Sequence, residues 1–475
     1  MFLDTPLSDV IDFVNEISST DSTIDDNKIN LSKIQSKFIS FCITSMVVLG
    51  NLCWDKMQRA SFGAFKSKAL GWMLHYSLIP WLKLWEASVI RIIKIAGLKG
   101  VLIIDDSDRI RAKGTWILFG LFKTKDKKTS GYVMAQNIVL LVFVTKYLTI
   151  PVGFKFFRPD PKWKEWREKD LELRKEKKLK KSERPKKPGR DPNYPMRTTI
   201  TVELLQNFKN LIPEAIITTV VADAAYLTTE LVRGTEKIYP DTQIISQICK
   251  TSLVSDGKKE KRNKSRSAEK YFENKTPVEE EISLRGMSPK KIKMLSARLY
   301  VHSKKRKFHI IALKYDKETE YRYLAATKLS WRAIDIIRAY AIRWLIEVVI
   351  EDWKVYDGWG KMAFQRGEDG ARRGVILSFL VDHFLTSHAL QLKQLKENKS
   401  IFTSGSLCRY FQSKVILAGV KTILQAPEPM LKLQSLMDNI ENVVDFRLSD
   451  KHMSGHNIGE FEESPSLKQR YKNAS

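Results

Sequence analysis

The spacing of apolar side chains changes along the chain. Residues 32–97 repeat them at helical intervals, in "SKIQSKFISFCITSMVVLG" and "ALGWMLHYSLIPWLKLWEASVIRIIKIAG". The preceding thirty or so positions are acidic and rich in Ser, Thr and Asp after a short amphipathic start. This pattern predicts a small helical domain over residues 1–97.

Three β-branched apolar runs follow in close succession: "GVLIIDDSDRIRAKG", "YVMAQNIVLLVFVT" and "LTIPVGFKFF". Runs of this kind joined by short turns predict an antiparallel meander. Downstream, "TVELLQNFKNLI" reads as a helix, "EAIITTVVADAAYLTTELVRG" as a strand, an acid and another helix, and "TQIISQIC" as a further strand. Alternation of strand and helix is typical of a mixed or parallel sheet.

The C-terminal half begins with a β pattern and becomes helical. The stretch "RLYVHSKKRKFHIIALKYDKETEYRYLAAT" alternates and contains a turn, which predicts a hairpin. Helices are expected over residues 338–354 and onward to about residue 395, then a smaller helical region to about residue 446 and a polar tail. No internal repeat is found.

Within "RAYAIRWLIEVVIEDWK", residues 338–354, the polar side chains gather on one face. At 100° per residue a sector of about 80° holds them, and an apolar sector adjoins it. The polar set is Tyr340, Arg343, Glu347, Glu351 and Lys354, and the apolar set is Ala341, Leu345, Val348 and Val349. Ion pairs at i, i+4 spacing, such as Arg343 with Glu347, would explain these charges without any function.

Composition adds a strong positive charge. The chain has a formal net charge of +27, and 19 of these charges lie in two tracts, residues 155–190 and 256–307. Such an excess favours a polyanionic partner, above all nucleic acid. An anionic membrane surface would attract the same charge, but the most apolar stretch is interrupted by Gln136, Asn137 and Lys146 and fits two strands better than one spanning helix. The N-terminal stretch is also acidic where a secretory signal is basic. We therefore expect a cytoplasmic, nucleoid-associated protein with no membrane contact.

Cysteine and histidine give little sign of a metal or disulfide framework. Cys42, Cys53, Cys249 and Cys408 lie far apart, with no C-x-x-C pair. His383 and His388 are five positions apart and do not share a helix face well, so a structural role is favoured over metal binding.

Acidic residues stand where two predicted strands end. Asp105 follows "VLII" and Asp223 follows "ITTVVA". Ligands of sheet proteins bind beyond the carboxyl ends of strands, so these acids and Glu347 of the helix are candidates for one site. Three carboxylates suit a hard divalent cation, and two such ions about 4 Å apart can drive in-line displacement at phosphorus. Arg343 and Lys354 would then hold flanking phosphates, and Tyr340 could donate to one.

The order Tyr340-x2-Arg343-x3-Glu347-x6-Lys354 resembles the Tyr-Arg-Glu-Lys signature of a large branch of insertion-sequence DDE transposases. The segments "LIIDDSD" and "VVADAAY" are similar to the strand-end motifs that carry that family's two aspartates, and the resemblance covers about residues 98–395. It implies an RNase H-like core of three antiparallel strands, a helix, two further strands and a helix bearing the glutamate. It also implies two Mg²⁺ or Mn²⁺ ions, held by Asp105, Asp223 and Glu347. The implied partners are terminal inverted repeats and target DNA, bound by a homodimer that cleaves with water and joins with the freed 3′-hydroxyl.

This resemblance predicts an α/β fold, an RNase H-like mixed sheet flanked by helices, with a β-rich insertion and helical N- and C-terminal regions. The expected domains after residues 1–97 are 98–255, the first part of the catalytic core with a basic insertion at 155–193; 256–325, a basic β-rich insertion; 326–395, the rest of the core with the glutamate helix; and 396–475, a helical region with a polar tail.

Several assignments stay open. The family shows Asp-x-Thr or Asp-x-Ser at the first site, which "DDSD" satisfies best at Asp105, with Asp106 as the alternate; Glu351 is the alternate to Glu347. Because neighbours on a strand point to opposite faces, only one of Asp105 and Asp106 should reach a metal. Some relatives flip a base onto an aromatic residue; the local candidates are Tyr321, Tyr323 and Trp331, for each of which core packing is the simpler explanation. Gln365, Arg366, Arg372 and Arg373 could contact DNA or be solvated charges. A nuclease without strand transfer and an inactive DNA-binding derivative are the alternative functions.

Overall fold

The computed structural model describes residues 3, 5–19, 29–50, 53–111, 118–125, 131–176, 178–257, 265–283, 289–316, 318–358, 367–397 and 399–443. The chain forms two compact units, residues 1–418 and 419–475. The second unit contains the end of helix α14 (Ser404–Leu424) and helix α15 (Pro429–Val443). All other elements belong to the first unit.

The first unit begins with five helices, as the apolar spacing predicts. They are α1 (Ser8–Ser19), α2 (Lys33–Leu49), α3 (Trp54–Ala60), α4 (Ser67–Tyr76) and α5 (Trp81–Ala96). A capping box of Ser32 and Gln35 starts α2, and Gly50 ends it with a φ of 67°, a conformation that glycine adopts without strain. Residues 38–48 of α2 are all buried, because α1, α4 and α12 surround that helix.

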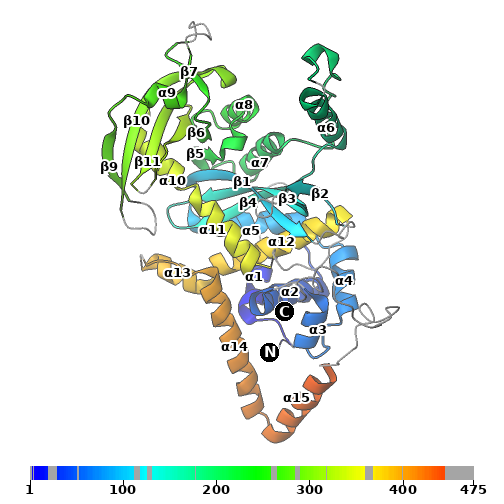
Figure 1. The fold of residues 1–475 in the computed structure, drawn as a ribbon. Helices are drawn as coiled ribbons and strands as arrows, with labels where there is room; N and C mark the ends of the chain where they lie inside the picture. Colours follow the sequence, from blue (N-terminus) through cyan, green and yellow to red (C-terminus); the bar gives the residue numbers. More distant parts are fainter. Residues whose placement is uncertain are drawn as a thin grey trace, which may run out of the picture. The chain divides into compact units, whose positions relative to one another are not determined.

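The central sheet has the predicted order of strands. β1 (Lys99–Arg111) pairs antiparallel with β3 (Tyr132–Val144), which pairs antiparallel with the short β2 (Leu121–Lys125) and with β4 (Thr149–Phe157). On the other side of β1, strands β5 (Ile216–Ala222) and β6 (Gln243–Ile248) run parallel to it and to each other. The long antiparallel strands β1, β3 and β4, followed by the parallel pair β5 and β6, confirm the predicted mixed α/β sheet of RNase H-like order; the short β2 is an addition to it (Figure 1).

Helices cover this sheet. α7 (Arg197–Leu211) contacts β3 and β4, and α8 (Thr229–Ile238) contacts α7. The later helices are α10 (Ala333–Ala341), α11 (Trp344–Val355), α12 (Gly367–Thr386) and α13 (Ala389–Lys396). Of these, α10 contacts β5 and β6, α11 contacts β1 and β4, and α12 packs on α2 and α5. α6 (Pro161–Lys175) buries no residue.

The basic β-rich segment continues the central sheet. It contains β7 (Leu253–Ser255), β8 (Arg266–Ser267), α9 (Ala268–Phe272), β9 (Val278–Ile282), β10 (Lys290–Val301), β11 (Arg306–Tyr315) and β12 (Arg322–Ala326). β10 and β11 form the predicted hairpin, and β12 pairs antiparallel with β6, so the described strands build one 12-stranded sheet. A second apolar core, which includes Leu299, Phe308 and Ile310, is shared by this segment with β6 and α8.

Two local expectations are wrong. β1 does not end at its acids but runs on to Arg111, because its second half stays paired with β3. The helix expected over residues 338–354 is interrupted between α10 and α11. There the main-chain N–H groups of Arg343, Leu345 and Ile346 donate to carbonyls three residues back instead of four. In α11 the buried residues are Ile346, Val349 and Trp353, whereas Leu345 and Val348 of the expected apolar face are half-buried.

Among the described helices, none is by itself long and apolar enough to cross a bilayer, although α2 with α3 and α12 with α13 reach that length as bent pairs.

Candidate active site

Asp105 and Asp223 stand next to each other at the end of β5. Ile104 of β1 pairs in parallel register with Ala222, the last residue of β5, so the next residues on the two strands are Asp105 and Asp223. The chain turns away after Asp223 into the short 3₁₀ helix η2 (Ala224–Tyr226). The Asp223 main-chain oxygen accepts from Ser246 Oγ at 3.0 Å, which ties this turn to β6.

The Asp105 carboxylate is partly buried and has too little positive charge nearby to offset its own. The pKa of Asp105 is raised from 3.8 to about 6, chiefly by burial; the charges of Asp106 and Asp223 also raise it, whereas the Asp106 N–H and Arg343 lower it. The Asp106 N–H donates to Asp105 Oδ1 at 2.8 Å. Clustered negative charge of this kind is relieved by a bound cation.

Arg343 joins the glutamate helix to the strand. Its Nη1 donates to Asp105 Oδ2 at 3.0 Å and its Nη2 to Glu347 Oε1 at 2.6 Å. The Asp105 and Arg343 side chains are 18% and 20% exposed, whereas Glu347 is 50% exposed. The i, i+4 ion pair considered from the sequence therefore exists, but the same guanidinium also reaches a strand 238 positions away.

The donor chemistry of Asp105, Asp223 and Glu347 fits a hard divalent cation, since all three supply carboxylate oxygen. Yet within the described residues no three His, Cys, Asp or Glu side chains are gathered closely enough to hold a metal. Arg343 lies between Asp105 and Glu347 and donates a hydrogen bond to one oxygen of each. In this arrangement the guanidinium bridges the two carboxylates.

The remaining predicted DNA contacts have mixed placements. Lys354 Nζ donates to the Asp108 main-chain oxygen at 3.1 Å, and burial lowers the pKa of Lys354, so this lysine fastens α11 to β1. Tyr340 is only 7% exposed, and Trp331 is half-buried against the first core. Both are therefore largely packed. Glu351, the alternate to Glu347, is exposed on α11.

Two arginines downstream of α11 are tied to protein groups. Arg373 Nη1 donates to the Leu74 main-chain oxygen at 2.9 Å, and Arg372 lies 3.6 Å from Glu368 on the same helix. Gln365 and Arg366 lie outside the described residues. Tyr323 is buried and Tyr321 packs beside it in the second core, as the simpler explanation expects.

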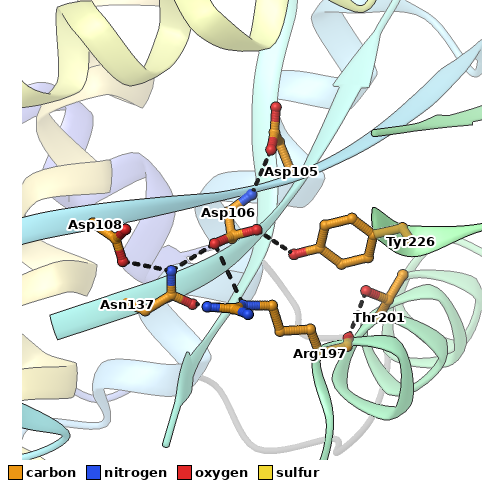
Figure 2. Close-up of polar contacts among 7 residues, drawn as sticks. All are labelled: Asp105, Asp106, Asp108, Asn137, Arg197, Thr201 and Tyr226. Carbon is orange, nitrogen blue, oxygen red and sulfur yellow. Dashed lines mark hydrogen bonds and ion pairs between the residues drawn. The ribbon is translucent and has the colours of Figure 1, made fainter. Parts of the chain in front are cut away.

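Asp106 belongs to a separate polar network on the opposite face of β1 (Figure 2). Its carboxylate accepts from Asn137 Nδ2 at 2.6 Å and from the Tyr226 hydroxyl at 2.9 Å, and it lies 3.4 Å from Arg197 Nε. Asn137 also donates to Asp108 Oδ1 at 2.8 Å. This network connects β1 and β3 with the start of α7 and the end of η2, and it engages both Asp106 oxygens. Only the interruption of an apolar run by Asn137 signals any part of it in the sequence.

A groove of about 720 Å³ runs beside Arg343 and Glu347. Five cationic side chains, from β10, β12, α10, the break before α11 and the turn after β3, line it, together with three aromatic residues. The cations are Lys146, Lys290, Arg322, Arg338 and Arg343, and the aromatics are Tyr315, Tyr340 and Trp344. Sequence reasoning missed Lys146, Lys290 and Arg322, because nothing in their local pattern distinguishes them from other surface cations.

The histidine and cysteine side chains named from the sequence make contacts that fit a structural role. His383 is buried; its Nε2 contacts the Pro151 carbonyl at 2.9 Å and its Nδ1 contacts Ser88 Oγ at 2.8 Å. Burial lowers the pKa of His383 to about 4, so its ring is neutral. Cys42, Cys53, Cys249 and Cys408 are all free thiols.

Comparison with solved structures yields distant similarities, among them a transposase complex and a nuclease. No protein family and no curated protein matches the sequence. A synaptic complex of piggyBac transposase with hairpin DNA shows 12% identity over 98% of this chain and 88% of that chain, with a TM-score of 0.39. The NurA nuclease from Sulfolobus solfataricus shows 10% identity over 51% of this chain and 72% of that chain, with a TM-score of 0.20. Both TM-scores are below 0.5, so this chain is similar to these structures only in a remote sense.

Proposed function

We propose that this protein is a DNA transposase of an insertion sequence, which binds the inverted repeats of its element as a homodimer and cuts and rejoins DNA strands. The observation that carries the proposal is the meeting of Asp105 and Asp223 with the Arg343–Glu347 pair of α11 at the end of β5. Residues that the sequence separates by more than a hundred positions thus form one carboxylate-rich edge beside a cationic groove.

In the proposed reaction two Mg²⁺ or Mn²⁺ ions supply the positive charge that activates water or a 3′-hydroxyl and steadies the leaving oxygen. Asp105 and Asp223 would be metal ligands from the two strands, which requires Asp105 to be ionised. Glu347 would become the third carboxylate ligand after it releases Arg343. The freed Arg343 guanidinium would then bind a phosphate of the DNA strand. The groove cations would bind the flanking backbone.

The test is strand cleavage of a duplex that carries the element's terminal repeats, taken from the DNA flanking the gene, in the presence of Mg²⁺. Asp105→Asn, Asp223→Asn and Glu347→Gln should each abolish cleavage while leaving DNA binding largely intact. Asp335→Asn on α10, an acid paired with Arg332 at the surface, is the matched control and should retain activity. Retained cleavage in any of the three variants would remove that residue from the site.

Two further readouts divide the alternatives. Glu351→Gln should retain cleavage; if it fails where Glu347→Gln succeeds, Glu351 is the ligand from α11. A joined product with target DNA separates a transposase from an RNase H-like nuclease that only cuts. Absence of cleavage in the unaltered protein, with binding preserved, would mark an inactive DNA-binding derivative.

A further inference from the structure

The segment between β4 and α7 forms an arm that folds on itself. α6 leads outward, and residues 178–196 return along it without an α-helix or a strand; they include the short 3₁₀ helix η1 (Lys181–Glu183). Trp166 Nε1 donates to the Pro185 carbonyl at 2.9 Å, and Arg184 pairs with Asp170 at 2.8 Å. Figure 1 shows α6 standing clear of the sheet, and no side chain of α6 is buried. The arm therefore has a defined shape although it adds nothing to the core.

Aromatic and cationic side chains hold the two halves of the arm together and attach its base to the sheet. Lys187 Nζ lies 4.3 Å from the Trp163 ring centre, and the Trp163 and Trp166 rings meet edge to face at 5.3 Å. At this base, Arg158 stacks over the ring of Tyr194 at 5.0 Å. Arg197, where the arm enters α7, stacks on a phenylalanine of β4 and pairs with Asp106. These contacts attach the arm to the sheet that carries the candidate site.

Positive charge is distributed unevenly over the two limbs of the arm. The helical limb, α6, interleaves six cations with four acids: Lys162, Lys164, Arg167, Lys169, Arg174 and Lys175 with Glu165, Glu168, Asp170 and Glu172. The returning limb, residues 178–190, has seven cations and one acid, Glu183. Arg184 is engaged by Asp170, and the other six are exposed: Lys178, Lys180, Lys181, Lys186, Lys187 and Arg190. Repulsion among them opposes folding unless an anion is nearby.

We propose that the returning limb, Lys178–Arg190, is a docking surface for the phosphate backbone of duplex DNA, outside the catalytic groove and independent of base sequence. Six exposed cations within residues 178–190 match the dense negative charge of a nucleic-acid backbone. A membrane is the poorer partner, because the two tryptophans face the returning limb and leave no broad apolar face to insert. The choice of DNA over RNA rests on the function proposed above.

The experiment compares two variants of the full chain that lose the same charge. The first carries Lys178→Gln, Lys180→Gln, Lys181→Gln and Lys186→Gln on the returning limb. The second carries Lys164→Gln, Arg167→Gln, Lys169→Gln and Lys175→Gln on α6, also four exposed cations. Neither set includes the residues that close the arm. Binding to a mixed-sequence duplex without inverted repeats is measured by fluorescence anisotropy over a range of salt concentrations, with EDTA present.

Each phosphate contact with duplex DNA contributes about 0.9 to the slope of log affinity against log salt, so losing four should make the slope shallower by about 3 to 4. We expect this change, with affinity weakened tenfold or more at low salt, for the returning-limb variant and a much smaller change for the α6 variant. Equal changes in both, or none in either, would overturn the proposal. So would equal or tighter binding of unaltered protein to double-stranded RNA or to vesicles of anionic phospholipid.

A third variant guards against misfolding of the arm. Replacing the same four returning-limb lysines with arginine keeps their charge and should keep the salt slope of the unaltered protein. A slope as shallow as that of the glutamine variant would show that altered structure, not lost charge, causes the defect. That result would overturn the proposal. Because the readout needs neither metal nor cleavage, docking on the arm can fail while cleavage persists, and cleavage can fail while the arm still binds.

Discussion

Removing the Arg343 guanidinium should weaken the junction of α11 with β1 in a way that depends on pH. In Arg343→Ala, Asp105 keeps its partly buried position but loses the Nη1 donor at 3.0 Å. A hydrogen bond to a charged group contributes about 1.5–3 kcal/mol, and the contact with half-exposed Glu347 adds only a few tenths because solvent screens it. We therefore expect a loss of about 2–3 kcal/mol where Asp105 is ionised in the unaltered protein, at about pH 8.

The sign of the pH dependence follows from the raised pKa of Asp105. A carboxyl whose pKa rises from 3.8 to about 6 on folding contributes stability that is complete below pH 3.8 and is lost as the pH rises through 6. Arg343 offsets part of that loss, so its removal matters above pH 6. At about pH 5 Asp105 is mostly protonated with or without the guanidinium, and the loss should fall below about 1 kcal/mol.

Hydrogen exchange of peptides from β1 and α11 measures the local opening free energy without requiring the whole unit to unfold in one step. Arg338→Ala, which removes an exposed guanidinium 3.9 Å from Asp335, is the control and should change it by less than about 0.5 kcal/mol. In an Asp105→Asn background the effect of Arg343→Ala should largely vanish. An equal loss at both pH values, or an undiminished loss in that background, would refute the assigned ion pair.

Two other perturbations test the surroundings of the site. Asp357 and Asp382 are buried carboxyls whose pKa burial raises, that of Asp382 to about 7. The stability that Asp382 contributes is complete below pH 3.8 and is lost as the pH rises through 7. Asp382→Asn should therefore reduce the fall in Tm between about pH 5.5 and about pH 8.5, and an unchanged fall would contradict this. Arg197→Ala should cost about 1–3 kcal/mol and speed hydrogen exchange at the start of α7, because Asp106 loses its ion pair; exchange unaltered there would mean that the network does not hold that helix.

Much of the fold follows from local pattern. The strands β1, β3 and β4, the parallel pair β5 and β6, and the helices on either side were all predicted from apolar spacing, because alternation and helical period are properties of a few neighbouring residues. The two wrong predictions, a continuous helix over residues 338–354 and the early end of β1, also have physical causes. The break before α11 interrupts a segment whose helical propensity is continuous, and β1 outlasts its apolar run because pairing with β3 satisfies its backbone.

Local pattern already singles out the residues that could do chemistry: Asp105 and Asp223 stand where apolar strand patterns stop, and Glu347 lies on a helix with cations. The bridge of Arg343 between Asp105 and Glu347, and the bond of Asp106 to Tyr226 on the other face of β1, become known only from the fold. This is because the face that a strand residue presents is fixed by sheet register and by what packs there. A shift of one residue exchanges the faces while leaving the local pattern intact.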